Sequence, residues 1–146
     1  MTNDRGIESA RQLLRVTFGV VPFLAGLDKF TNLLADWPRY LSPVAEAILP
    51  LSGQTFMYVA GVIEMVVGVA ILTRWTMLGS YVAAAWLVAI ALNLVASGTF
   101  LDVAVRDLVM AVGAYTLARL TEARESARVP VPVEEAQAHT VRAKVA

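Results

Sequence analysis

Two adjacent charges, Arg106 and Asp107, interrupt an apolar stretch that is long enough to be a membrane span. The stretch covers residues 100–120, FLDVAVRDLVMAVGAYTLARL, and the pair lies about a third of the way along it. A charged residue at the centre of a bilayer helix costs at least about 2.5 to 3.5 kcal/mol, so both charges need partners. We therefore expect polar side chains on neighbouring helices to meet this pair.

The other apolar stretches supply four polar candidates: Asp28, Lys29, Glu64 and Asn93. Counting depth at about 1.5 Å per residue along antiparallel spans places Glu64 near the middle of the membrane and the others in its outer part. In a structural interpretation these groups form ion pairs that fix the helix register, Lys29 with Asp107 and Arg106 with Glu64, with Asp28 as a further pairing residue.

A functional interpretation of the same cluster stays open beside the structural one. Intramembrane ionisable groups are candidates for binding or transport, and here they would face a cavity that opens toward the outer leaflet. The ligand would be a small anion or a polar head such as a quinone carbonyl. The ligand-binding residues expected on this interpretation are Lys29, Glu64, Asn93, Arg106 and Asp107, and none is assigned a catalytic role.

Composition excludes several other kinds of chemistry. The chain has 146 residues, is 58% hydrophobic and has no net charge, and its mean hydropathy is +0.63. One domain in a lipid environment is expected, and no basic block predicts nucleic-acid binding. Cysteine is absent, so thiol redox chemistry and thiolate metal ligation are excluded for this chain. The one histidine, His139, lies in a polar tail, so no metal site is predicted.

Stretches of about 20 apolar residues predict transmembrane helices. We expect an all-α integral membrane four-helix bundle in antiparallel up-down order. Residues 1–11 form a short N-terminal segment, and 12–120 form the bundle. The expected spans are 12–35, 55–73, 75–96 and 100–120; an outer loop with a short helix covers 36–54, and a tail covers 121–146.

Interfacial anchors and the orientation follow from charged and aromatic residues near the span ends. Amphipathic rings suit the headgroup level, and Arg15 can extend from its span to the phosphates. The expected anchors are Arg15, Trp37, Tyr40 and Trp75. Lys and Arg mark the cytoplasmic side. One side carries Arg5, Arg11, Arg74, Arg119, Arg124 and Arg128, and the other carries only Arg39 and Lys29. Both termini are therefore expected in the cytoplasm.

Four segments resemble the DoxX-like family of small bacterial membrane proteins. They are RVTFGVVPFLAGLDKF in the first span, GVIEMVVGVAIL in the second, and the NL and RDL segments of the third and fourth. The resemblance covers residues 11–120 and implies a four-helix bundle in a bacterial plasma membrane, with some members attached to thiosulfate:quinone oxidoreductase. The matching positions are Arg15, Lys29, Glu64, Asn93, Arg106 and Asp107.

Three functions are left open by the sequence. The first is a membrane subunit of a respiratory or other redox complex that anchors a partner enzyme and contributes to a quinone site. The second is an assembly or scaffold protein without a ligand, and the third is a small-molecule transporter. Membrane lipid and other protein subunits, either a redox enzyme or further copies of the chain, are the expected partners. No motif for heme, flavin or an iron-sulfur cluster is present, so a quinone is the one cofactor left open.

Overall fold

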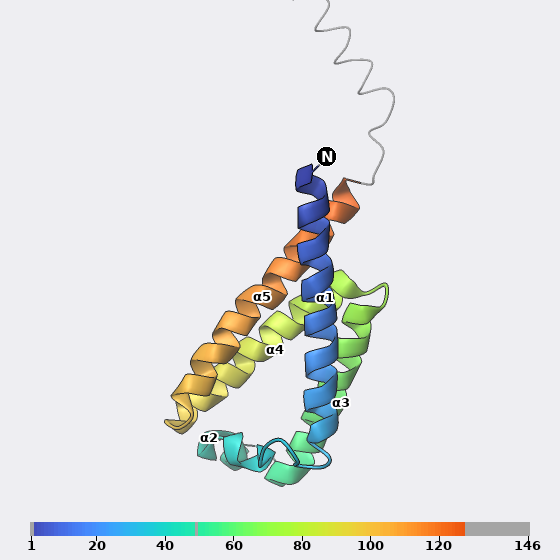
Figure 1. The fold of residues 1–146 in the computed structure, drawn as a ribbon. Helices are drawn as coiled ribbons and strands as arrows, with labels where there is room; N and C mark the ends of the chain where they lie inside the picture. Colours follow the sequence, from blue (N-terminus) through green and yellow to red (C-terminus); the bar gives the residue numbers. More distant parts are fainter. Residues whose placement is uncertain (1, 49, 128–146) are drawn as a thin grey trace, which may run out of the picture.

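A computed structural model describes residues 2–48 and 50–127, and every regular element in these ranges is a helix. Four long α-helices carry the fold: α1 (Thr2–Asp28), α3 (Gly53–Leu72), α4 (Thr76–Ser97) and α5 (Leu101–Ser126). A 3-10 helix, η1 (Trp37–Tyr40), and the short α2 (Pro43–Ile48) lie in the loop between α1 and α3. The N-terminus and the end of α5 lie at one end of the molecule, and α2 lies at the other (Figure 1).

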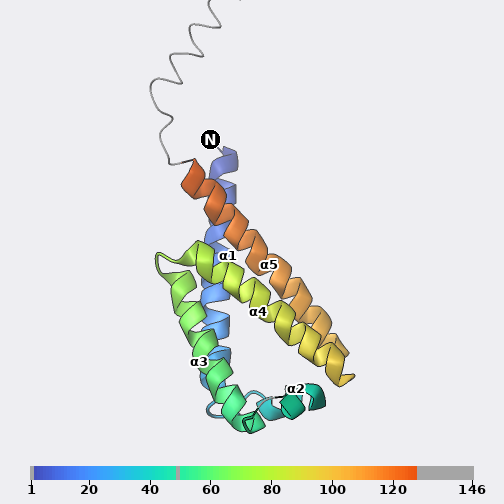
Figure 2. The ribbon, with the colours of Figure 1, turned by 180° about the vertical axis from the view of Figure 1, so that it is seen from behind.

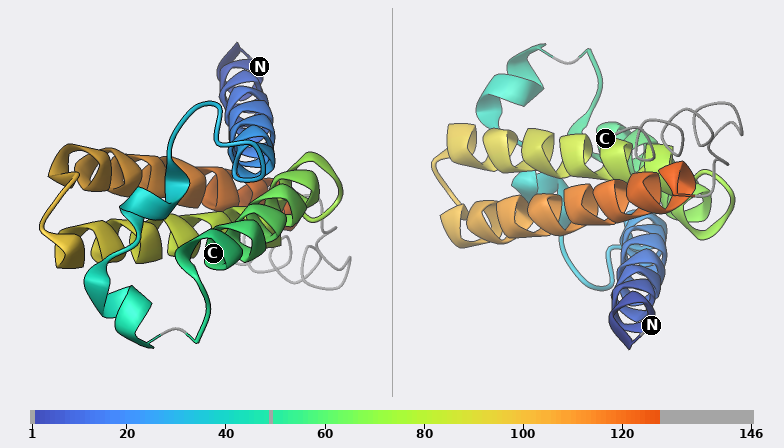
Figure 3. Two further views of the ribbon diagram at one scale, coloured as in Figure 1. Left: turned by 90° about the horizontal axis from the view of Figure 1, so that it is seen from below. Right: turned by 90° about the horizontal axis from the view of Figure 1, so that it is seen from above.

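The long helices form two pairs, α1 with α3 and α4 with α5 (Figures 1 and 2). The pairs meet at the end that holds the α3–α4 turn and diverge toward the end that holds α2. Seen along the molecule, α4 and α5 run side by side while α1 leaves them at a large angle (Figure 3). The bundle is therefore two helical hairpins joined at one end.

Glycines allow α1 and α3 to touch through their backbones. A Cβ added at Gly26 would lie 2.5 Å from the Gly61 carbonyl oxygen, and one added at Gly61 would lie 2.6 Å from the Gly26 oxygen. One added at Gly68 would lie 2.5 Å from the Gly19 oxygen. Small residues in such stripes are typical of close helix contacts in membranes.

Small side chains, chiefly alanines, are buried on α4 and α5, and two apolar clusters fill the rest of the interior. Phe18, Ile71 and Leu117 centre the cluster where the two pairs meet, and Leu94 centres the one at the diverging end. Outward side chains are largely apolar along all four long helices. An exposed apolar surface of this extent marks a membrane or protein interaction site.

Helix bounds differ from the expected spans at both ends of the chain. The first helix begins at Thr2 rather than at residue 12, because Glu8 accepts hydrogen bonds from Arg11 and Gln12 one turn later and supports the polar turns. It ends at Asp28 instead of continuing to residue 35. The last helix continues to Ser126, so the first turns of the expected tail are helical. Residues 128–146, which include Arg128 and His139, lie outside the described residues.

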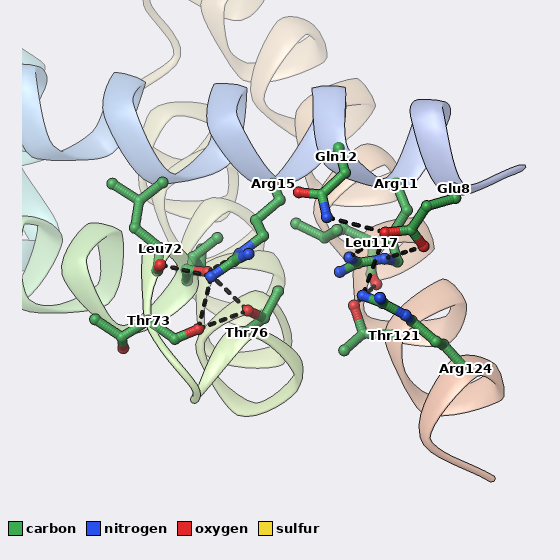
Figure 4. A network of polar contacts seen from close by, with 11 residues as sticks. Glu8, Arg11, Gln12, Arg15, Leu72, Thr73, Thr76, Leu117, Thr121 and Arg124 are labelled. Atoms are coloured by element: carbon green, nitrogen blue, oxygen red, sulfur yellow. Dashed lines mark hydrogen bonds and ion pairs between the residues drawn. The ribbon is translucent and has the colours of Figure 1, made fainter. Parts of the chain in front are cut away.

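Arg15 joins α1 to the C-terminal end of α3 (Figure 4). Its guanidinium donates to the backbone carbonyls of Ile71 at 3.1 Å, Leu72 at 2.6 Å and Thr73 at 2.9 Å. The last carbonyls of a helix have no partner within it, so the arginine satisfies groups that α3 leaves open. Membrane anchoring was expected from this residue, whereas the structure gives it a partner within the protein.

Glu8 links the start of α1 to the end of α5 (Figure 4). Its carboxylate forms an ion pair with Arg124 of α5 at 3.2 Å and another with Arg11 of its own helix at 2.8 Å. The hydrogen bonds from Arg11 and Gln12 lower the pKa of Glu8 from 4.5 to about 2. A lowered folded-state pKa gives stability that is present above the unfolded value and lost as pH falls through the folded value.

We therefore expect the protein to lose stability between pH 4.5 and pH 2 partly through Glu8. The measurement is thermal unfolding in mild detergent across this range for the wild type and Glu8→Gln. The variant should show a shallower pH dependence in this window, whereas identical profiles would contradict the pKa assigned to Glu8.

Candidate functional site: a buried lysine-glutamate pair

Lys29 and Glu64 form a buried ion pair between α1 and α3. Lys29 follows the last residue of α1, and its Nζ donates to Oε2 of Glu64, near the middle of α3, at 2.6 Å. The two side chains are only 6% and 8% exposed. The Gly26–Gly61 contact, three residues before each partner, holds the two backbones close enough for this pair. Charges this well buried require both the pairing and further hydrogen bonds.

The further hydrogen bond comes from the second helix pair. Trp86 of α4 donates through Nε1 to Oε1 of Glu64 at 3.2 Å. Each carboxylate oxygen of Glu64 therefore has its own donor, one from α1 and one from α4. Glu64 therefore connects the two hairpins through side-chain hydrogen bonds in the interior.

Asp28 organises the loop that follows α1. Its Oδ1 accepts the Leu33 backbone N–H and the Thr31 hydroxyl, and its Oδ2 accepts the Leu34 backbone N–H, all at 3.0 Å. Oδ2 also accepts Nε1 of Trp37 at 2.8 Å. Asp28 was expected in an ion pair, but no ion pair to it occurs among the described residues. The loop donors occupy its carboxylate instead.

Trp37 covers Lys29 from the loop side. The ammonium nitrogen lies 3.8 Å from the centroid of the indole ring, a cation–π geometry. Lys29 is thus held between the Glu64 carboxylate and the face of Trp37. The indole was expected to anchor the loop at the headgroup level, yet its N–H is used by Asp28.

The expected pairing of Lys29 with Asp107 and of Arg106 with Glu64 is wrong. Arg106 instead contacts its own neighbour Asp107, at 3.5 Å. The reason is helix arrangement: α1 packs along α3 and meets α5 chiefly near Phe18 and Gly113, so Lys29 reaches Glu64 first.

Asp107 and Arg106 point in different directions, as consecutive helical residues must. The side chain of Asp107 is 8% exposed, and that of Arg106 is 65% exposed. Asp107 is therefore buried in the bundle, whereas Arg106 lies at its surface.

Asn93 of α4 binds the outer loop. Its Nδ2 donates to the Tyr40 carbonyl at 2.7 Å, and its Oδ1 accepts the Ser42 backbone N–H at 3.1 Å. Both ends of the amide thus hold backbone groups of the loop next to α2. Its expected role as a ligand-binding residue stays a prediction.

Tyr40 and Trp75, both expected as membrane anchors, differ from each other in their surroundings. Tyr40 packs on Phe100 with ring centroids 4.5 Å apart. Trp75, in the α3–α4 turn, is 53% exposed and lies beneath the Arg74 guanidinium at 5.2 Å. Trp75 is therefore free to serve at a membrane surface, and that role stays a prediction.

Sequence reasoning missed Trp86 as a member of the cluster. A signal was present: Trp86 lies in the middle of an apolar stretch, far from either end, and a buried indole N–H needs an acceptor. Glu64 was the acceptor at comparable depth. The described residues contain no group of three or more His, Cys, Asp or Glu side chains that could hold a metal ion.

A sequence profile of the DoxX family matches residues 10–101. The chain belongs to the DoxX family. The DoxX match covers most of α1 and all of α3 and α4, so it includes Lys29, Glu64 and Trp86 and leaves out Arg106 and Asp107. No curated protein and no solved structure matches the chain.

Membership places the chain in a family of membrane proteins, and its helices agree with that. By length and composition, α3 and α4 could each cross a membrane, with mean hydropathies of 2.1 and 1.9 over their most apolar windows. These are the two such helices in the described part of the chain. The other two long helices carry more charge, including Arg11, Arg15, Arg106 and Asp107.

Proposed function

We propose that all four long helices cross a bacterial plasma membrane, with both termini in the cytoplasm. At about 1.5 Å per residue, α1 and α5 are each about 40 Å long, enough to span the hydrocarbon core. Their outward faces are apolar, with Val16 and Val20 on α1 and Val109 and Val112 on α5 exposed. The charges that lower their mean hydropathy lie near the helix ends or point into the bundle, apart from Arg106.

Cysteine labelling tests this topology without interference, because the chain has no native cysteine. A cysteine at Ser52, which precedes α3, should react with a membrane-impermeant maleimide added to intact cells. A cysteine at Ser126, at the end of α5, should react only after the cells are opened. Reaction of Ser126→Cys in intact cells would overturn the orientation.

We propose further that the protein is the membrane subunit of a redox complex, which anchors a partner enzyme and binds the head of a quinone at the Lys29–Glu64 pair. The observation that carries this proposal is the buried Lys29–Glu64 ion pair, to which Trp86 of the second hairpin donates a hydrogen bond. Intramembrane charges are costly and therefore mark functional sites by default. The family resemblance adds a link to quinone-dependent enzymes.

The chemistry assigned to the pair is electrostatic. Lys29 would donate to a quinone carbonyl as negative charge develops on it, and a low-dielectric site strengthens such a contact. Glu64 is already within hydrogen-bond distance of the ammonium and would exchange the proton.

The experiment is affinity purification in mild detergent, followed by mass spectrometry of proteins and lipids. A quinone and a soluble or peripheral redox enzyme should copurify with the wild type. Copurification of the enzyme without a quinone would support the anchoring function and contradict the quinone site. The absence of both would contradict the whole proposal.

A scaffold function without a ligand is the second candidate, and one observation favours it. Every buried side-chain nitrogen or oxygen in the described residues has a hydrogen-bond partner, so the cluster is complete without a ligand. A pull-down with and without residues 128–146 separates the candidates. Loss of the partner on truncation, with no quinone in either sample, would favour the scaffold.

A further inference from the structure

The part of the outer loop that joins α1 to α2 covers residues 29–42 in the structure. One aromatic side chain in it, that of Trp37, contacts the buried charge pair. Leu33 and Leu34 are 83% and 76% exposed, and most other side chains before residue 37 are exposed as well. Trp37 is half-buried and turns inward to Lys29. Segments with few buried contacts open at low free energy, so the loop is suited to movement.

Two fixed points limit which part of the loop can move. At one end Asp28 binds the Leu33 and Leu34 backbone, and at the other Asn93 of α4 holds Tyr40 and Ser42. Trp37 lies between these points. Its indole donates one hydrogen bond, to Asp28, contacts the ammonium, and lies against the Tyr40 ring with centroids 6.0 Å apart.

The ammonium of Lys29 has donors to spare. Three N–H groups are available, and one hydrogen bond, to Glu64, occurs among the described residues. The Trp37 ring offers only a π face, which is a weaker acceptor for an ammonium than a carbonyl oxygen. A flat ligand with a ring carbonyl would therefore bind Lys29 better than the indole does.

We propose that Trp37 occupies the position on Lys29 that a flat, carbonyl-bearing ring takes when it binds, so that the ligand must displace Trp37 and move the outer loop. This proposal rests on the proposed quinone site. It adds how the ligand enters that site and how Trp37 regulates its binding. The indole is an internal competitor: it shields the charge pair when no ligand is present. Removing it should strengthen binding, whereas a simple lining residue would weaken binding when removed.

The test is isothermal titration of decylubiquinone into the full-length protein in mild detergent. Trp37→Ala should bind about tenfold more tightly than the wild type, as expected for loss of a desolvated cation–π contact. Trp37→Phe keeps a ring but loses the bond to Asp28, so its affinity should be intermediate. Trp75→Phe, in the turn between α3 and α4, is the matched control and should bind like the wild type.

A second readout follows the loop itself. A spin label on Asp36→Cys, an exposed position between the two fixed points, should become more mobile when decylubiquinone is added to the otherwise wild-type chain. It should not respond in a chain that also carries Lys29→Met and Glu64→Leu. This readout keeps the proposal testable even if Trp37→Ala accumulates poorly.

The outcomes separate this inference from the proposed function. If the wild type binds decylubiquinone and the Lys29/Glu64 double variant does not, the quinone site stands. Under that result, unchanged or weaker binding by Trp37→Ala together with an unresponsive label would overturn the displacement of Trp37. If neither the wild type nor Trp37→Ala binds, both the quinone site and this inference are overturned.

Discussion

Lys29→Met alone is expected to lower the free energy of unfolding by about 3 to 5 kcal/mol, because it leaves Glu64 buried without its counter-charge. Glu64→Leu alone should cost a similar amount by stranding the Lys29 ammonium. The double variant should recover most of this loss, since replacing both charges of a buried pair with apolar groups is often neutral. A remaining loss of about 1 to 3 kcal/mol is expected, because Trp86 no longer has an acceptor for its indole N–H. The measurement is thermal unfolding in mild detergent for all four proteins.

Glu122→Gln is the matched control for this cycle. Glu122 pairs with Arg119 at 2.7 Å, but both side chains are largely exposed, and exposed pairs contribute only about 0 to 1 kcal/mol. Additive losses in the Lys29/Glu64 cycle would show that the two residues do not stabilise one another. If the double variant recovers its abundance in the membrane while quinone-linked activity of the partner stays low, the pair also serves the ligand.

Gly61→Leu is expected to prevent the protein from accumulating, and Gly61→Ala to destabilise it by about 1 to 3 kcal/mol or more. The added Cβ would meet the Gly26 carbonyl oxygen at 2.6 Å, and a backbone atom cannot rotate away as a side chain can. The helices would have to separate, which would also lengthen the Lys29–Glu64 contact. Membrane abundance and the unfolding temperature measure the effect.

Gly6→Ala is the control for this prediction, because a Cβ at Gly6 would meet nothing within 4 Å. Gly6 lies in the interior of α1, where alanine is the better helix former by about 1 kcal/mol. It should leave stability unchanged or raise it. An unfolding temperature for Gly61→Ala equal to that of the wild type would mean that α1 and α3 are not in backbone contact.

Sequence reasoning predicted the helical elements because apolar length is a local property. The two most apolar stretches became α3 and α4 with bounds close to those expected. It failed at the ends of α1, where Glu8 extends the helix and Asp28 terminates it through side-chain contacts. Such contacts depend on individual geometry, which hydropathy does not record.

The sequence indicated which residues form the buried cluster better than it indicated which of them pair with one another. Depth along a span placed Lys29 and Glu64 in the interior, but depth does not say which helices are neighbours. The glycines that bring α1 against α3 decided the pairing. Trp86 was overlooked because its side chain is largely apolar, and its single indole N–H does not stand out in an apolar stretch as a charge or an amide does.

The contacts of Arg15 also bear on the order in which the chain is assembled during synthesis. Its acceptors, the carbonyls of Ile71, Leu72 and Thr73, all precede α4 in the chain. A nascent chain that has been translated through Thr73 therefore already contains every group needed to lock α1 onto α3, including Lys29 and Glu64. Trp86 arrives later and adds its hydrogen bond to a carboxylate that is already neutralised. The second hairpin therefore packs against a first hairpin whose Lys29–Glu64 pair is already formed. Neither charge of that pair depends on the second hairpin for its neutralisation.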